Sequence, residues 1–434
     1  MNILLIDAYS AQHIGNLALV DSALEQLKIK FPEAEFTILS FDPVSIAKYS
    51  RCRTLETLWA EQFSGYSFIE KVAWIVRESL WVFANVFNLS VLKRLGLMVK
   101  FDKYTFSKKK LAALKAYSDA DIVVSISGEA LQDSEWKRVP LFLFGYWLAY
   151  KLEKVVAIFP QSIGPLKKGF IRVLVGYVLN LCDLVLPRDE FSFQTVRNMK
   201  INPRKTYLVP DLAVKQPYIP LDQARRLLES QGVKLDKRPL IGMAISKWED
   251  IKYEGYFLTM QQLCRFILDQ LNGSVVFFLA NRRLQKDLGD WDLTQKLYEL
   301  FSSRNNVTLL SKEYTPRECK GMLGQLDLFI STRMHVAIFA TMAGTPTITV
   351  NTQLKLQGYM NLIHQGNRSC DVNDFTILKA IELLKDSLAH SEEIRAALKN
   401  SRIELEKQTG MASELLRIIY DQKNKLSRDL RGKR

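Results

Sequence analysis

The stretch LDLFISTRMHVAIFATMAGTPTITVNTQLK, residues 326–355, predicts a β-strand, a helix and a second β-strand in succession. Its apolar run 326–330 favours a buried strand, and a helix is expected over about residues 335–343. Gly344 ends that helix, and the second strand is expected over 345–350. This order is a β-α-β unit, from which parallel sheets covered by helices are built.

Two side chains suited to anion chemistry lie at the start of this helix, Arg333 and His335. Unpaired N–H groups and the positive end of the helix dipole favour a phosphate or carboxylate there, and an arginine fork adds two charge-assisted bonds. A histidine beside such an anion can hold a proton near neutral pH, which makes His335 a candidate general acid. The same residues also fit a surface arginine and a histidine that simply begins a helix.

Short apolar strands alternate with helical stretches in both halves of the chain. In the N-terminal half, strands are expected at 2–6, 35–39, 121–126, 154–159, 184–186 and 206–209. In the C-terminal half they are expected at 240–245, 273–280, 307–310, 326–330 and 345–350. The chain has 434 residues, more than one hydrophobic core usually serves, so two domains are expected. The predicted fold class is α/β, with two Rossmann-like domains facing a cleft.

A charged, proline-containing stretch divides the two halves. Residues 215–238 contain Pro217 and Pro220 and are followed by Pro239, and we interpret them as a linker. The expected organisation is an N-terminal domain over 1–214 with a helical, basic insertion at about 44–115, the linker 215–238, a C-terminal domain over 239–380, and C-terminal helices with a basic tail over 381–434.

Composition narrows the class of protein. Hydrophobic residues make up 48% and charged residues 24%, which is typical of a globular protein. The five cysteines are scattered without a C-x-x-C pair, so neither a disulfide framework nor a zinc site is indicated, and no metal is expected. The N-terminal MNILLIDAY is typical of a first buried strand rather than a leader, so a cytoplasmic location is expected.

The formal charge of +14 implies attraction to an anionic partner. Residues 93–110 hold seven basic residues and one acid, and residues 423–434 hold six and one. Residues 70–99 mix aromatic side chains with cations and carry too many charges to span a bilayer. They fit either an amphipathic helix on an anionic membrane surface or helices packed on the domain with a solvated basic loop. Nucleic acid is not expected, because no recognisable binding motif accompanies the charge.

Polar residues follow several strands at the edge where ligands of such sheets bind. His13, Gly15 and Asn16 follow the first strand, in a turn that admits a ligand close to the backbone. The other candidates are Ser127 and Gly128 as anion-binding N–H donors, Glu129 or Asp133 as a base, Gln161, Ser162 and Gly164 in a stiff turn, and Arg188, poised like Arg333. Each of these segments is also compatible with an ordinary turn. Asp189 could equally form an ion pair with Arg188, and Asp211 could equally cap a helix.

The order of these pieces resembles the polysaccharide pyruvyl transferase family over about residues 1–360. The matching segments are Gly15-Asn16, Gly128 to Asp133, Gln161 to Pro165, Arg188-Asp189 with Ser192, Pro210-Asp211, Arg333-Met334-His335, and Lys355 with Gly358. Two positions depart from the family pattern. Only Asp21 lies near the first turn in place of a Gly-Asp pair, and Ser127-Gly128-Glu129 replaces three consecutive glycines. The bulkier, negative Glu129 bears on acceptor recognition and on activity.

The resemblance implies a fold similar to GT-B glycosyltransferases and transfer of a pyruvyl group from phosphoenolpyruvate, a donor substrate rather than a cofactor, to a sugar. Arg188 and Arg333 would hold the donor's two anionic groups and His335 would protonate its methylene carbon, while Glu129, Asp133 and Asp189 remain alternative bases. The expected substrate-binding residues are Arg188, Arg333, Ser127, Gly128, Gln161, Ser162, Gly164, Lys355, Asn16 and Glu129.

The resemblance also implies an acceptor in a cell-surface polysaccharide or lipid-linked oligosaccharide, used at the cytoplasmic face of an anionic membrane. Two other functions fit the residues. A nucleotide-sugar-dependent glycosyltransferase would hold a diphosphate on Arg333 and Lys355, and a non-catalytic scaffold would be indifferent to His335→Ala.

Overall fold

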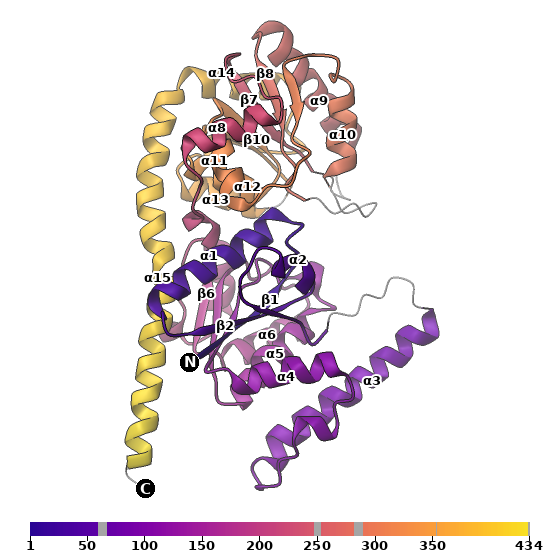
Figure 1. Cartoon of the computed structure of the whole chain (residues 1–434), viewed down its shortest axis with the longest axis vertical. Helices are drawn as coiled ribbons and strands as arrows, with labels where there is room; N and C mark the ends of the chain where they lie inside the picture. Colours follow the sequence, from indigo (N-terminus) through magenta and orange to yellow (C-terminus); the bar gives the residue numbers. More distant parts are fainter. Residues whose placement is uncertain (60–66, 247–252, 282–289, 353, 433–434) are drawn as a thin grey trace. The chain divides into compact units, whose positions relative to one another are not determined.

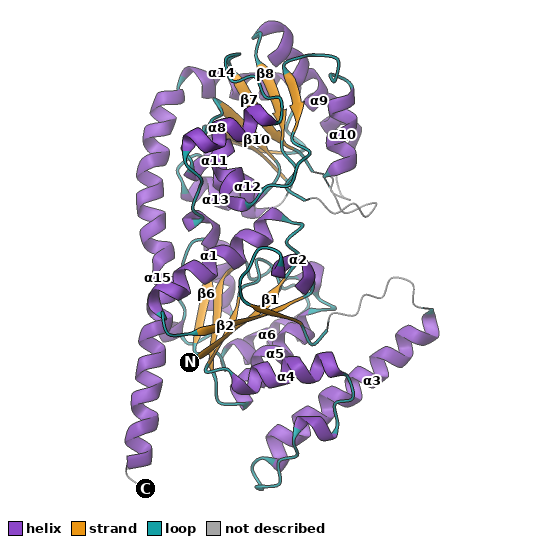
Figure 2. Cartoon of the chain, in the orientation of Figure 1, coloured by secondary structure: helices purple, strands orange, loops and turns teal. Residues whose placement is uncertain are grey.

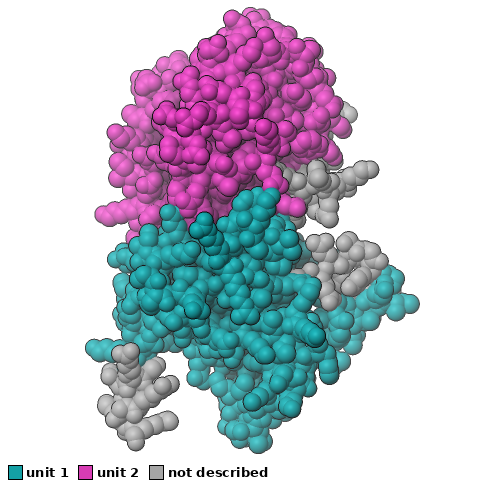
Figure 3. All heavy atoms as spheres, viewed as in Figure 1, with its two compact units in different colours: residues 1–11, 24–209, 412–434 teal, residues 12–23, 210–411 magenta. Residues whose placement is uncertain are grey.

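The computed structural model divides into two compact units (Figure 3). The first comprises Met1–Ala11, Leu24–Val209 and Ala412–Arg434, and the second comprises Gln12–Ala23 and Pro210–Met411. The structure describes residues 1–59, 67–246, 253–281, 290–352 and 354–432. The domain limits expected from the sequence, 1–214 and 239–380 with a linker at 215–238, stay predictions.

The first unit is built on a six-stranded parallel sheet (Figure 2). Its strands are β1 (Asn2–Ala8), β2 (Glu35–Ser40), β3 (Arg53–Glu56), β4 (Ile122–Ser125), β5 (Val155–Gln161) and β6 (Leu184–Pro187). They lie in the order β3-β2-β1-β4-β5-β6, with each neighbouring pair parallel. This is the strand order of a doubly wound Rossmann sheet, in which the order reverses between β1 and β4.

Helices cover this sheet because its strands β4, β5 and β6 are buried on both faces. The helices that contribute residues to the unit are α1 (Ile14–Lys30), α2 (Pro43–Ala47), α3 (Phe68–Phe87), α4 (Lys108–Asp119), α5 (Val139–Lys151), α6 (Gly169–Leu179), α7 (Glu190–Asn198) and α15 (Ser391–Gly432). One core joins alternate residues of the strands, such as Leu4 and Val156, to buried residues of α4, α5 and α6. These three helices therefore form a layer on one face of the sheet.

The second unit repeats the same plan (Figure 1). Its strands are β7 (Leu240–Ala244), β8 (Ser274–Phe277), β9 (Val307–Leu309), β10 (Leu328–Ser331), β11 (Thr347–Asn351) and β12 (Ser369–Asp371), in the order β12-β11-β10-β7-β8-β9. All pairs are parallel. Its helices include α8 (Leu221–Ser230), α9 (Tyr253–Arg265), α10 (Trp291–Glu299), α11 (Pro316–Leu323), α12 (Met334–Met342), α13 (Leu354–Leu362) and α14 (Ile377–Ala389). The predicted fold class, α/β with two Rossmann-like sheets, is confirmed.

The sequence prediction was wrong at three strands. Residues 206–209 form no strand, since Thr206 makes only an isolated bridge to Val185. This segment instead donates from Tyr207 N and Val209 N to the edge of β6. The short strands β3 and β12 were missed because both lie at sheet edges and lack the apolar run of a buried strand.

Candidate active site

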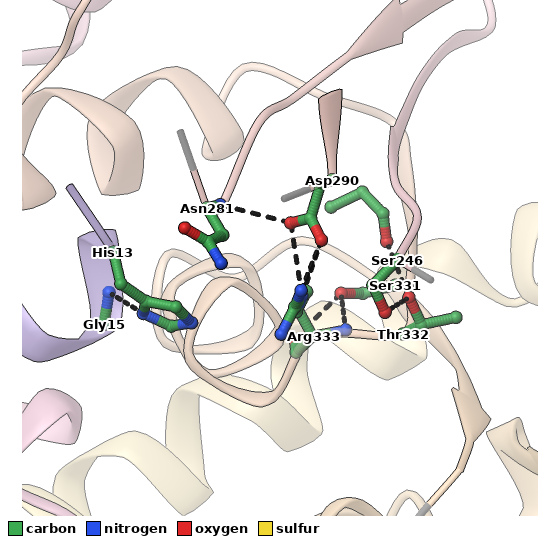
Figure 4. Close-up of polar contacts among 9 residues, drawn as sticks. His13, Gly15, Ser246, Asn281, Asp290, Ser331, Thr332 and Arg333 are labelled. Carbon is green, nitrogen blue, oxygen red and sulfur yellow. Dashed lines mark hydrogen bonds and ion pairs between the residues drawn. The ribbon is translucent and has the colours of Figure 1, made fainter. Parts of the chain in front are cut away.

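The turn between β10 and α12 presents Arg333 at the carboxyl edge of the second sheet. Ser331 Oγ accepts a hydrogen bond from Arg333 N at 3.0 Å and donates one to Arg333 O at 2.9 Å. Thr332 N donates to Ala244 O at 3.0 Å, and the hydroxyls of Thr332 and Ser246 lie 2.8 Å apart (Figure 4). The turn is thereby tied to the end of β7, where the strand order of this sheet reverses.

Arg333 is the N-cap residue of α12, as the sequence predicted for the helix N-terminus. Its Nε lies 3.0 and 3.1 Å from the two carboxylate oxygens of Asp290, and a second guanidinium nitrogen also bonds Asp290. The Asp290 side chain is 1% exposed and also accepts a bond from Asn281 N at 3.1 Å. Burial raises the pKa of Asp290, while Arg333 acts in the opposite direction. The ion pair fixes the position of the Arg333 guanidinium, and the Arg333 side chain remains 15% exposed.

His335 is enclosed by two other parts of the second unit. Its Nε2 lies 3.9 Å from Asp211 Oδ2, and its side chain is 12% exposed. The ring meets the His13 ring edge to face, with centroids 6.1 Å apart. A Cβ built on Gly15 would lie 2.3 Å from His335 Nδ1, so only glycine fits at that position. His13 Nδ1 in turn accepts a bond from Gly15 N at 3.2 Å.

Asp211 has two roles, of which the sequence predicted one. Its carboxylate caps the short helix η5 (Leu212–Lys215) by accepting a bond from Ala213 N at 2.8 Å, as expected of a helix cap. The second role, facing His335, was missed, because nothing in the spacing of two residues so far apart indicates their approach. The Pro210-Asp211 match to the family pattern was the only signal.

The start of α1 belongs to this site through backbone contacts. Ile14 N donates to Ala280 O at 3.0 Å, and His13 forms an antiparallel bridge with Asn281. Asn16, half-buried, donates from its backbone N to His13 O at 3.0 Å. The beginning of α1 is therefore held at the carboxyl end of β8.

Two further family positions in this unit are now placed. Asp21 accepts bonds from Arg317 Nε at 3.0 Å and NH2 at 3.2 Å, and from Gln216 Nε2 at 2.7 Å. These bonds give Asp21 a structural role joining α1 to α11. Lys355, predicted to bind substrate, lies in the first turn of α13 and is half-buried.

Arg188 lies in the first unit and differs from Arg333 in its setting. Helix α7 begins at Glu190 with Asp189 as its cap, so Arg188 precedes the helix N-terminus instead of capping it. The Arg188 side chain is 0% exposed, with NH2 3.2 Å from Glu129 Oε1 and Nε 2.9 Å from Ser162 Oγ. The glutamate that departs from the family pattern is therefore an ion-pair partner of the predicted donor-binding arginine.

A closed hydrogen-bond network joins the turn after β5 to the start of α7. Ser162 Oγ donates to Asp189 Oδ2 at 3.0 Å, and Asp189 Oδ1 accepts from Ser192 N at 2.8 Å. Ser192 Oγ accepts from Ile163 N at 2.9 Å. Gly164 has a φ of +92°, a region that strongly favours glycine. These bonds join the segment Gln161 to Pro165 to the segment that begins at Arg188-Asp189.

The remaining candidates of the first unit lie at the ends of β4 and β5. Ser127 is buried and accepts from Glu129 N at 3.3 Å, while Gly128 O accepts from Ser162 N at 3.0 Å. Gln161 is 0% exposed, and within the described ranges neither polar atom of its side chain has a hydrogen-bond partner. Leaving a buried amide without hydrogen bonds costs about 1–3 kcal/mol for each polar atom.

The predicted site residues therefore form two groups, each at the carboxyl edge of one sheet. Arg333 and His335 belong to the second unit with Asn16 and Lys355. The members in the first unit are Arg188, Glu129, Ser127, Gly128, Gln161, Ser162 and Gly164. Among the described residues, no group of three or more His, Cys, Asp or Glu side chains is arranged to hold a metal ion.

Two parallel α/β sheets of this kind are also found in GT-B-like glycosyltransferases and epimerases. A UDP-GlcNAc 2-epimerase from Neisseria meningitidis, solved with UDP-GlcNAc, is 12% identical and has a TM-score of 0.57, covering 97% of this chain and 100% of its own. A glycosyltransferase from Rickettsia africae is 14% identical with a TM-score of 0.56, covering 98% of each chain. At these identities the likeness shows the fold alone.

Residues 13–353 match the polysaccharide pyruvyl transferase family, and the chain belongs to that family. It is also 20% identical over 448 residues to the amylovoran biosynthesis protein AmsJ of Erwinia amylovora, covering 99% of each sequence. Family and fold together make the chain a polysaccharide-modifying transferase.

Proposed function

We propose that this protein transfers a pyruvyl group from phosphoenolpyruvate to a sugar of a cell-surface polysaccharide or lipid-linked oligosaccharide, forming a pyruvate ketal. The observation that carries the proposal is the placement of Arg333 and His335 within one helical turn at the N-terminus of α12. This position offers an anion site next to a proton donor. Family membership supports the same chemistry.

In the proposed reaction, His335 gives a proton to the methylene carbon of phosphoenolpyruvate, and positive charge develops at the adjacent carbon. A sugar hydroxyl attacks that carbon, the bond from carbon to the phosphate oxygen breaks, and a second hydroxyl closes the ketal. One hydroxyl proton replaces the proton lost from His335, and the other leaves with phosphate. The Asp211 carboxylate, 3.9 Å from His335 Nε2, would stabilise positive charge on the ring before transfer.

Arg333 is proposed to bind one anionic group of the donor through the exposed edge of its guanidinium. The Asp290 carboxylate accepts hydrogen bonds from the guanidinium and so fixes the direction in which that edge points. Arg188 is proposed to bind or position the other donor anion, with Glu129 reducing the local positive charge. Further substrate-binding residues are proposed in each unit: Lys355 and Asn16 in the second, and Ser127, Gly128, Ser162 and Gly164 in the first.

The test is phosphate release from phosphoenolpyruvate by the wild type, His335→Ala and His335→Gln, with a panel of free and lipid-linked oligosaccharides. Acceptor-dependent release that falls at least about a hundredfold in both variants supports the proposal. The matched control is His390→Ala, because the His390 side chain is 50% exposed and lies at the C-terminus of α14. Release that is unchanged in both His335 variants contradicts the role given to this residue.

A nucleotide-sugar-dependent glycosyltransferase is the second candidate function, because structural neighbours include a glycosyltransferase and an epimerase solved with a nucleotide sugar. Ligand binding to the native state raises the melting temperature, so the two donors can be compared directly. Stabilisation by phosphoenolpyruvate favours pyruvyl transfer. Stabilisation by a nucleotide sugar alone, without phosphate release, favours glycosyl transfer. Stabilisation by neither, with indifference to His335→Ala, favours a non-catalytic scaffold.

A further inference from the structure

Helix α3 buries two polar side chains against the first unit and exposes a stripe of apolar side chains to solvent. The inward residues include Glu78, which is 4% exposed, and Asn85, which is 0% exposed. The outward residues recur at helical spacing and are Ile69, Val72, Val76, Leu80, Phe83 and Phe87, with exposed fractions from 43 to 78%. A helix that packs on a domain in water normally has the opposite pattern. The outward stripe therefore indicates a partner.

Specific contacts hold the polar face of α3 to the rest of the first unit. Glu78 forms an ion pair with Lys110 of α4, and the Lys110 ammonium lies 4.9 Å from the Trp81 ring centroid and 5.2 Å from that of Trp59. Trp81 Nε1 donates to Thr105 Oγ1 at 3.2 Å. Glu78 and Trp81 lie on the side of α3 opposite the apolar stripe. Their contacts therefore fix the orientation of α3 with the stripe outward.

The segment after α3 folds back along it. Asn88 Nδ2 donates to Val99 O at 2.7 Å, and Val99 N donates to Asn88 Oδ1 at 2.8 Å. Tyr104 OH donates to Asn85 Oδ1 at 3.1 Å. Figure 2 shows α3 as a long helix with this returning segment beside it. The result is a hairpin of one helix and a mostly irregular returning segment, whose connecting loop is also exposed.

That loop adds apolar and basic side chains to the same hairpin. Leu95 and Leu97 are 65 and 63% exposed. Three exposed cations accompany them, Arg94, Lys100 and Lys103. Residues 67–106 hold six Lys and Arg against three Asp and Glu. An apolar surface bordered by cations is complementary to a bilayer surface that contains anionic lipid.

We infer that the α3 hairpin, residues 67–106, docks the first unit onto an anionic membrane surface, with α3 lying in the plane of the interface. The sequence prediction that residues 70–99 carry too many charges to span a bilayer was wrong for Val72–Leu92, which is long and apolar enough to cross one by length and composition, and 28% of its most apolar stretch is buried. Crossing would carry the ion pair of Glu78 and the amides of Asn85 and Asn88 into hydrocarbon, at a high free-energy cost. Lying in the interface keeps these groups on the protein side.

Helix α6 carries a second stripe of the same kind. Phe170, Val173 and Tyr177 are 62, 71 and 59% exposed, and they are accompanied by exposed Lys168 and Arg172. Helix α6 is part of the layer that also contains α4 and α5. Trp81 of α3 packs against the core under this layer, so α3 and α6 share one core. A second apolar and basic stripe on this layer favours a lipid surface over a single protein partner. The inference does not depend on the reaction that the protein catalyses.

The test is flotation of the full chain with vesicles of phosphatidylcholine, alone or with a third of phosphatidylglycerol. The wild type is expected to float with the mixed vesicles, and Leu80→Asp/Phe83→Asp to bind them about tenfold or more weakly. Arg94→Gln/Lys100→Gln/Lys103→Gln should weaken binding to the mixed vesicles only, and added salt should reduce the difference. Circular dichroism verifies that each variant is folded.

A matched control places the same charges on exposed apolar residues away from the hairpin. Leu378 and Ile403 are 79 and 61% exposed on α14 and α15, so Leu378→Asp/Ile403→Asp should float like the wild type. The inference is overturned if the wild type stays in the aqueous fraction or if the α3 variants float unchanged. It is also overturned if the wild type ignores vesicles while sedimentation shows a dimer that Leu80→Asp/Phe83→Asp converts to a monomer.

Discussion

The ring of His335 occupies the space that a side chain at Gly15 would need. A Cβ on Gly15 would lie 2.3 Å from Nδ1 and 2.5 Å from Cγ of that ring. Real Cβ atoms do not approach other atoms so closely, and the ring is further enclosed by His13 and Asp211. Gly15 of the Gly-Asn motif and His335 of the Arg-x-His motif therefore depend on each other structurally.

Gly15→Ala should displace His335 and lower the rate of pyruvyl transfer about tenfold to a hundredfold, because small misplacement of a reacting group is costly. Steady-state kinetics of phosphate release measures the effect. Gly255→Ala is the matched control, since a Cβ at Gly255 meets no atom of the described residues within 4 Å. This control should stay fully active and gain about 0.5–1 kcal/mol in the free energy of unfolding. Full activity of Gly15→Ala would contradict the role given to His335.

Removing one partner of the Arg333–Asp290 pair should be more costly than removing both. Asp290→Ala leaves the guanidinium without its buried carboxylate, at an expected cost of about 3–5 kcal/mol in the free energy of unfolding. A double-mutant cycle with Arg333→Met isolates the coupling free energy. The exposed pair Arg225–Glu229 is the reference and should give less than about 1 kcal/mol. Equal coupling in both pairs would show that Asp290 does not hold Arg333.

Glu129→Gln should lower the KM for phosphoenolpyruvate severalfold. The substitution removes a negative charge 3.2 Å from the Arg188 guanidinium and keeps the size of the side chain. Initial rates at varied phosphoenolpyruvate give KM and kcat separately. The effect should shrink with added salt. A KM that rises or stays constant would show that Arg188 does not contribute to donor binding.

Asp7→Asn should stabilise the protein near neutral pH. Asp7 is buried at φ 64°, where asparagine is also favoured, and its Oδ2 accepts bonds from Ser125 Oγ at 2.7 Å and Tyr146 OH at 2.9 Å. Burial raises the pKa of Asp7 from 3.8 to about 6. The stability that the protonated carboxyl contributes is fully present below pH 3.8 and is lost as the pH rises through about 6.

The gain from Asp7→Asn should therefore grow between about pH 4 and 6 and level off above, reaching about 3 kcal/mol at most. Urea unfolding of both proteins across this pH range measures it. A gain that is the same at every pH would indicate an effect of packing or backbone conformation instead of ionisation.

Gln161→Met should raise the melting temperature and lower transfer activity. Methionine has a similar volume and removes an amide that has no hydrogen-bond partner among the described residues. Thermal unfolding and phosphate release are measured on the same preparations. Loss of stability together with activity would mean that the amide stabilises the fold and that its role in binding is unsupported.

Much of the fold could be predicted from the chain itself. Apolar runs such as 2–6 and 184–186 became β1 and β6, because fully buried parallel strands need continuous apolar sequence. The helix after β10 begins one residue before the expected His335 and ends at Met342, two residues before Gly344. Edge strands β3 and β12 could not be found this way, since they are only partly buried and their pairing depends on the neighbouring strand.

The candidate site was predictable in part. Local pattern placed Arg333 and His335 at a helix N-terminus, and Asp211 at a cap. The carboxylates that face these residues were not predictable, because Asp290 pairs with Arg333 from a separate segment of the chain. The same holds for Glu129, whose pairing with Arg188 spans 59 positions.

The sequence by itself determined the α/β class, the repeated parallel architecture and the family, because hydrophobic periodicity and ordered motifs are local properties of a chain. Only the tertiary structure decided what each motif residue touches. Gly15 is needed for the His335 ring, Glu129 neutralises Arg188, and the apolar stripe of α3 faces outward. Contacts of this kind join distant segments, and they depend on strand order and helix orientation, which residue spacing does not encode.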